Sequence, residues 1–238
     1  MKEPTSHLPL SRYAGRVYRN FPTLVESQDL MDDLAPDPEQ QRILEKFFYD
    51  DDHRWLAPIE RIMKKSVQQI IQEQIDAKFQ PSVWQASRYS DGTWAVLYTA
   101  ESEETALREA LFHMRRFYAE ELTAGTLRVQ RRVLSIFAVS VACVDLTMVV
   151  GLDCQALVSQ DESGYLYCQS LARSGIHDGA ELLRAPSARD PDGHTVPIFN
   201  QEVAKDDEGH LKYLRCVLKP DGSAEVTGMI EEKTKKYP

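Results

Sequence analysis

The alternation of apolar and polar positions is clearest between residues 87 and 114, where it predicts a loop, a strand and a helix in succession. The run Thr93–Ala100 (TWAVLYTA) is short, apolar and rich in residues that favour extended backbone, so it predicts a buried strand. Ser102 stands where the N-cap of the next helix belongs, and apolar residues recur at helical spacing after it. We therefore expect a helix from about residue 103 to residue 122.

Two further helices are predicted in the N-terminal third of the chain. Asp37 followed by Pro38 and Gln40 is typical of a helix start, with an N-cap, a proline in the first turn and a capping glutamine. Residues 58–78 keep the longest helical rhythm of apolar positions in the chain. We interpret residues 29–80 as a helical insertion, folded as a hairpin, that offers a surface to a partner or to a second copy of the chain.

The rest of the chain reads mostly as short strands joined by turns. Strands are predicted at residues 11–22, 133–141, 180–185, 195–200, 210–218 and 224–230. A helix is expected at residues 165–173, stopped by Gly175, and disorder is expected at residues 1–11 and in the last eight residues. Mixed strands and helices without regular βαβ alternation predict an α+β fold, which we assign to one domain covering residues 1–238.

Composition narrows the function classes. The net charge of −9 argues against nonspecific binding to nucleic acid, which requires a basic face. The most apolar run, residues 136–144, is far shorter than the roughly 20 residues of a membrane span, and the N-terminus lacks the apolar segment of a secretory signal. The four cysteines show no metal-binding spacing and are typical of core thiols in a reducing compartment, so a cytoplasmic protein is expected.

Three polar side chains surround the central strand: Arg88 before it, Tyr98 inside it and Glu109 on the following helix. Each has an ordinary interpretation when taken alone. Arg88 would be a loop cation, Tyr98 a strand aromatic, and Glu109 a solvated carboxylate on the face opposite Leu107.

In their local context these residues resemble the central motif of the RES-domain family, the toxins of bacterial toxin–antitoxin pairs. The family pattern is an arginine in a loop, a strand ending in "lYtse" and a helix carrying "AlxE", and Arg88, Leu97–Glu101 and Ala106–Glu109 occupy those places. Downstream, Ala185–Arg189 resembles the "PSar" element of the family, and upstream Val17–Arg19 resembles its "yR" element.

The resemblance implies an ADP-ribosyltransferase-like fold, with two small, mostly antiparallel sheets around a cleft. It implies an enzyme that consumes NAD by phosphorolysis or hydrolysis, or by moving ADP-ribose onto a protein target, without a metal. It also implies an Xre-type antitoxin as partner. The roles it implies are phosphate or ribose binding by Arg19 and Arg88, a nicotinamide-side wall from Tyr98, catalysis by Glu109 and completion of the pocket by Ser187. Arg16 competes with Arg19 for the N-terminal position.

These side chains suit the chemistry of NAD cleavage. Loss of nicotinamide develops positive charge on the ribose, as in glycoside hydrolysis, and an ionised Glu109 would stabilise that charge. Arginine binds phosphate oxygens through a planar fork of donors that never loses its charge.

Two other classes of function have some support in the sequence. A metal-dependent hydrolase built on His53 and Asp50–Asp52 is disfavoured, because adjacent side chains diverge and no HxxxH spacing exists. A non-catalytic binding module remains an alternative, because the loop reads Ser87-Arg88-Tyr89-Ser90 where the family has "GRWN".

Overall fold

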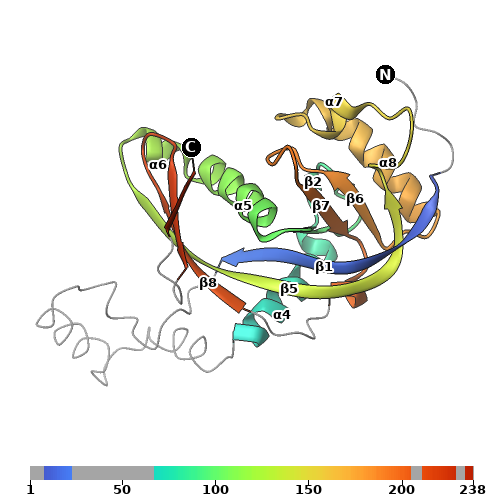
Figure 1. The fold of residues 1–238 in the computed structure, drawn as a ribbon, viewed down its shortest axis with the longest axis horizontal. Coiled ribbons are helices and arrows are strands. Elements are labelled where there is room, and N and C mark those ends of the chain that lie inside the picture. Colours follow the sequence, from blue (N-terminus) through green and yellow to red (C-terminus); the bar gives the residue numbers. More distant parts are fainter. Residues whose placement is uncertain (1–7, 23–66, 205–210, 229–233, 238) are drawn as a thin grey trace, which may run out of the picture.

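The computed structural model describes residues 8–22, 67–204, 211–228 and 234–237 (Figure 1). The predicted helix that begins at Asp37, and the hairpin that it would form with the next helix, lie outside these ranges. The described end of that next helix is confirmed, because helix α4 spans Val67–Lys78.

Ten strands occur in the described ranges, and the predicted α+β class is confirmed. Eight form one sheet in the order β1-β4-β7-β6-β5-β8-β9-β10, and β2 and β3 pair separately. All pairs are antiparallel except β5 with β6. The bounds are β1 Leu10–Pro22, β2 Ala86–Ser87, β3 Ser90–Asp91, β4 Leu97–Ala100, β5 Arg128–Asp145, β6 Leu182–Pro186, β7 His194–Ile198, β8 Leu211–Leu218, β9 Ala224–Gly228 and β10 Thr234–Tyr237.

The large sheet bends back on itself around β5. One edge of β5 pairs with β1 from Leu10 to Pro22, while its other edge pairs first with β8 and then with β6. Strand β1 also pairs with β4 at Tyr18 and Ala100, so β1, β4, β7, β6 and β5 form a closed ring. The strand predicted at residues 11–22 is confirmed as β1, which pairs with β5 along its length and with β4 at Tyr18.

The helices lie on both sides of this bent sheet (Figure 1). Their bounds are α4 Val67–Lys78, α5 Glu103–Phe117, α6 Ala119–Thr123, α7 Cys154–Leu157 and α8 Tyr165–His177, with short 3-10 turns at Pro81–Val83, Glu162–Gly164 and Gln201–Ala204. Within the described ranges, no helix has the length and hydropathy needed to cross a bilayer.

The predicted helix at residues 103–122 is confirmed, with one interruption. Ser102 caps its N-terminus by accepting a hydrogen bond from the Thr105 amide at 3.0 Å. The backbone leaves the helical region at Tyr118, which separates α5 from the short α6.

Successive strand residues face different hydrophobic layers, as the two-residue period of a strand requires. Cys143 and Leu182 belong to the layer that packs against Ile71 and Ile75 of α4. Their chain neighbours Val144 and Leu183 belong to the layer under α8. A third layer packs α5 against β8 and β9. The sheet is thus covered on opposite faces by α4 and α8.

Two predictions about glycine and cysteine residues are wrong. Gly175 does not stop α8 but lies inside it, where a Cβ would approach the Leu183 side chain to 3.2 Å, so a small residue lets the helix pack on β6. The chain leaves the helix at Gly179, which has a φ of +96°. Cys154 is exposed rather than a core thiol, unlike the other three cysteines.

The ends of the chain are more ordered than the sequence pattern predicts. Leu8 is fully buried and β1 begins at Leu10, so the frayed segment cannot extend to residue 11. Thr234–Tyr237 pair with β9 although the polar composition favours disorder.

The strand predicted at Thr93–Ala100 is shorter than expected, because β4 covers only Leu97–Ala100.

Replacing Ile75 with alanine tests the layer that fixes α4. The side chain is fully buried against the sheet, so its removal leaves a cavity and should lower the free energy of unfolding by about 3 kcal/mol. Urea denaturation followed by circular dichroism measures this change. Leu166→Ala, at a position 71% exposed, is the control and should change it by less than about 0.5 kcal/mol. Equal losses in both variants would contradict the proposed layer.

Candidate functional site

A cleft of about 750 Å³ opens between α5, the segment from Val83 to Val96, the end of α4 and the edge of β1. A volume of this size is typical of small-molecule and cofactor sites. Four residues predicted from the sequence line it, namely Arg19, Arg88, Tyr98 and Glu109. Arg16 is exposed and is not among the lining residues.

The Glu109 carboxylate is held by a residue from a distant segment. The Ser187 hydroxyl donates a hydrogen bond of 2.6 Å to Glu109 Oε1. The same hydroxyl accepts hydrogen bonds from the backbone amides of Arg189 and Asp190, both at 3.1 Å. Ser187 is only 3% exposed, so water has little access to it. A serine hydroxyl has one proton to donate, and here it goes to Glu109. Ser187 therefore orients the acid from behind the cleft wall.

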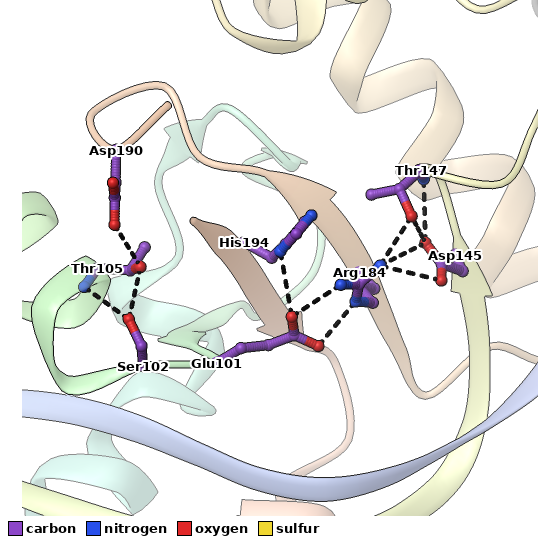
Figure 2. Close-up of polar contacts among 8 residues, drawn as sticks. All are labelled: Glu101, Ser102, Thr105, Asp145, Thr147, Arg184, Asp190 and His194. Carbon is purple, nitrogen blue, oxygen red and sulfur yellow. Dashed lines mark hydrogen bonds and ion pairs between the residues drawn. The ribbon is translucent and has the colours of Figure 1, made fainter. Parts of the chain in front are cut away.

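A second contact joins the same two segments one helical turn earlier (Figure 2). The Thr105 hydroxyl donates to Asp190 Oδ2 at 2.7 Å and lies 2.8 Å from the hydroxyl of Ser102. Thr105 and Glu109 are four residues apart on α5, so they lie on the same helix face. A Cβ on Gly193 would clash with both Thr105 and Asp190, so this approach requires glycine.

Burial and charge act in opposite directions on Glu109. Burial raises the pKa of its carboxyl above the ordinary value. The Ser187 hydrogen bond and the charges of Arg189 and Arg88 lower the pKa, while the charge of Asp190 raises it. The acid is thus partly desolvated but surrounded by groups that favour its ionised form.

Arg88 lies in the cleft wall with its guanidinium facing protein oxygens. Nη1 donates to the carbonyl of Leu157 at 3.0 Å, and Nη2 donates to the carbonyl of Ser159 at 2.5 Å. The guanidinium carbon lies 5.1 Å from the centre of the Tyr165 ring. These contacts fix the loop that follows α7 and hold a positive charge close enough to favour ionised Glu109.

Tyr98 contacts cleft residues from two segments, β1 and the loop that carries Arg88. Its hydroxyl donates to Ser87 Oγ at 2.8 Å and accepts from the Tyr89 amide at 2.9 Å, and burial raises its pKa to about 12. Its backbone carbonyl accepts a hydrogen bond of 2.7 Å from Arg19 Nη1. The guanidinium carbon of Arg19 also lies 5.6 Å from the centre of the Phe21 ring.

Sequence reasoning missed two cations in the cleft, Lys78 and Arg189. The Arg189 guanidinium stacks 3.4 Å from the centre of the Phe112 ring and donates to the side chain and backbone oxygens of Gln160. Arg189 could have been suspected, because it lies two residues after Ser187 in a recognised motif. Lys78 gave no signal, because it ends a helix assigned to an insertion.

A second polar network ties the strand ends outside the cleft (Figure 2). Arg184 donates to both carboxylate oxygens of Glu101, at 2.7 and 2.9 Å, and forms an ion pair of 3.3 Å with Asp145. Its Nη1 donates to the Thr147 hydroxyl at 2.8 Å, and His194 Nδ1 lies 3.2 Å from Glu101. The hydrogen bonds to Glu101 raise the pKa of Arg184. This network joins β4, β5, β6 and β7 where the ring closes.

Within the described ranges, no group of three or more His, Cys, Asp or Glu side chains could hold a metal ion together. The donors that face the cleft are one carboxylate, hydroxyl groups and cations. Such a set suits an organic anion with an electron-poor centre.

Fold and site together define an α+β protein whose cleft presents a hydrogen-bonded carboxylate among cations. The model of the family described as RES domain matches residues 58–218, so the chain belongs to the RES domain family and the predicted resemblance is confirmed. Arg19 lies outside the matched residues.

No curated protein matches the chain. Among solved structures, the chain is similar to the one titled as the crystal structure of the M. tuberculosis MbcT–MbcA toxin–antitoxin complex. The sequence identity is 14% and the TM-score is 0.44, over 89% of this chain and 88% of that chain.

Two variants should move the pKa of Glu109 in opposite directions. Ser187→Ala removes a donor to the ionised carboxylate, so the pKa should rise further. Asp190→Asn removes a neighbouring negative charge, so the pKa should fall. Carboxyl ¹³C NMR titration measures both, with Glu109 assigned by comparison with Glu109→Gln. Shifts of the same sign in the two variants would refute this account of the site.

Gly193→Ala tests the close approach between α5 and the loop after β6. The added Cβ must displace Thr105 or Asp190, which should lower the free energy of unfolding by about 1–3 kcal/mol. The matched control is Gly15→Ala, whose Cβ would make ordinary contacts of 3.4 Å or more with Tyr13. Thermal unfolding of both variants measures the loss of stability. A loss of stability in Gly193→Ala no larger than in Gly15→Ala would show that Gly193 does not lie tightly against Thr105 and Asp190.

Proposed function

We propose that this RES-domain protein cleaves the bond between nicotinamide and ribose in NAD. The C1′–N1 bond breaks, its electron pair leaves with nicotinamide, and C1′ forms a bond to an oxygen of phosphate or water, which releases a proton. The observation that carries the proposal is the hydrogen bond from Ser187 to Glu109 at the edge of the cleft.

Glu109 would act on the charge that develops as nicotinamide leaves. The ribose becomes oxocarbenium-like, and a carboxylate in a partly desolvated site stabilises that charge more strongly than it would in water. Ser187 would keep one carboxylate oxygen fixed and leave the other for the ribose or for the incoming nucleophile. In this role Ser187 would position Glu109 rather than contact the substrate itself.

The surrounding side chains support the same chemistry. Tyr98 and Tyr165 line the cleft near Arg88 and offer aromatic surface to a flat ring. Arg88 and Arg189 favour the ionised form of Glu109 through their charges. These neighbours offset part of the effect of burial, which raises the pKa of Glu109 overall.

Membership of the RES domain family supports a role as the toxin of a toxin–antitoxin pair in the cytoplasm, with an Xre-type antitoxin as partner. NAD loss would account for toxicity, because NAD is a cofactor of many oxidoreductases. Transfer of ADP-ribose to a protein would use the same cleft and differ only in the nucleophile.

Glu109→Gln should reduce NAD consumption by at least about 10²-fold, because it removes the charge that stabilises the transition state while preserving shape. Glu104→Gln is the matched control, since Glu104 lies on the same helix and pairs with Arg108 at the surface. Nicotinamide release by the purified protein is the measurement. Unchanged release in Glu109→Gln would eliminate the assigned role, and no release by the wild type would eliminate the function.

The product identifies the acceptor. Wild-type protein incubated with NAD yields ADP-ribose if water is the nucleophile, and ADP-ribose 1″-phosphate if added inorganic phosphate is. Label from radioactive NAD that remains on protein instead would favour the transferase.

A further inference from the structure

Four basic side chains line the cleft within the described ranges, and they differ in what they already bind. Arg88 donates to the backbone carbonyls of Leu157 and Ser159. Arg189 donates to Gln160 and stacks on Phe112. A substrate phosphate would have to displace these contacts to reach either guanidinium. The other two cations, Arg19 and Lys78, come from β1 and α4, and Arg19 donates to the backbone carbonyl of Tyr98.

Lys78 is the last residue of α4, and several contacts fix the position of that helix. Ile71 and Ile75 are buried against the sheet, at 2% and 0% exposure. The Gln74 side chain donates to the carbonyl of Pro22 at 3.1 Å, at the end of the strand that carries Arg19. The end of α4 is therefore held beside β1.

Lys78 also has a simpler interpretation, because a cation in the last turn of a helix interacts favourably with the helix dipole. The helix dipole accounts for a basic residue at the end of α4. It does not account for the position of Lys78 on the cleft wall, which Arg19 also lines. Lys78 is exposed at the surface, but its partial desolvation and the charge of Arg19 both lower its pKa. Within the described ranges, no carboxylate forms an ion pair with Lys78. An anion between the two cations would remove their repulsion.

The arrangement along the cleft fits a dinucleotide. Arg19 bonds the backbone carbonyl of Tyr98, whereas the hydroxyl of the same tyrosine lies on the loop that carries Arg88. Tyr98 thus contacts both Arg19 and the loop that carries Arg88, and Glu109 lines the same cleft. A diphosphate held by Arg19 and Lys78 would be joined through a ribose to the reactive carbon, which would face the acid.

We propose that Lys78, together with Arg19, binds the diphosphate of the dinucleotide, so that helix α4 supplies part of the substrate site. The inference rests on the proposed function for the identity of the substrate. It assigns to α4 a role in binding that is separate from the chemistry at Glu109.

Lys78→Gln should weaken binding of ADP-ribose about tenfold, because it removes one charge-assisted hydrogen bond to phosphate. Isothermal titration calorimetry on the full chain measures this without turnover. Binding of nicotinamide riboside, which has no phosphate, should not change, and Lys78→Arg should retain most of the affinity for ADP-ribose. The matched control is Lys219→Gln, which removes the same charge from a lysine paired with Glu225 on the β8–β9 hairpin.

Turnover separates this inference from the proposed function. If wild-type protein binds ADP-ribose in a Lys78-dependent way but releases no nicotinamide from NAD, the subsite stands and the function fails. If NAD is cleaved and Lys78→Gln leaves both KM and ADP-ribose affinity at the wild-type values, the function stands and the subsite fails. Absence of ADP-ribose binding by the wild type would also overturn the subsite, as would equal weakening in Lys219→Gln.

Discussion

Helix α5 is held against the loop between β6 and β7 by two hydrogen bonds, and the geometry of the site depends on them. Ser187 bonds Glu109, and Thr105 bonds Asp190 one helical turn away. Two contacts on one helix face fix both the position of α5 and its rotation about its own axis. The lack of a side chain at Gly193 allows the backbone to come this close. The orientation of the acid is therefore a property of the fold before any substrate binds.

Much of the local structure could be predicted from neighbouring residues alone. Ser102 as a cap and the helical spacing after it depend on interactions within a few residues, and the structure has both. Periodicity also put Glu109 on the face of α5 away from Leu107. It could not show that this face borders a cleft, because the contact with Ser187 joins segments 78 residues apart. Only the order of motifs in the family resemblance brought those two residues together.

The failed predictions share a physical cause. Composition predicted disorder for the C-terminal segment, yet Thr234–Tyr237 gains backbone hydrogen bonds from β9, which composition does not report. The sequence predicts a helix stop at Gly175, but its small size matters for packing on β6 instead. Local preference was overruled in each case by packing or pairing with another element of the fold. Lys78 belongs to the same group, since its place in the cleft follows from the packing of α4 rather than from its neighbours.

The cations of the cleft fall into two kinds, and this difference explains how one site can hold both an acid and an anionic substrate. Arg88 and Arg189 bond protein oxygens, so their charge acts on Glu109 while their donors stay engaged. Arg19 and Lys78 come from other elements, β1 and α4, and Arg19 donates to the backbone carbonyl of Tyr98. A chain with a net charge of −9 repels anions at long range, so binding must come from charges fixed at short range. Because β1 is closed into the ring by β4 and β5, it can present such a charge at a fixed distance from the acid.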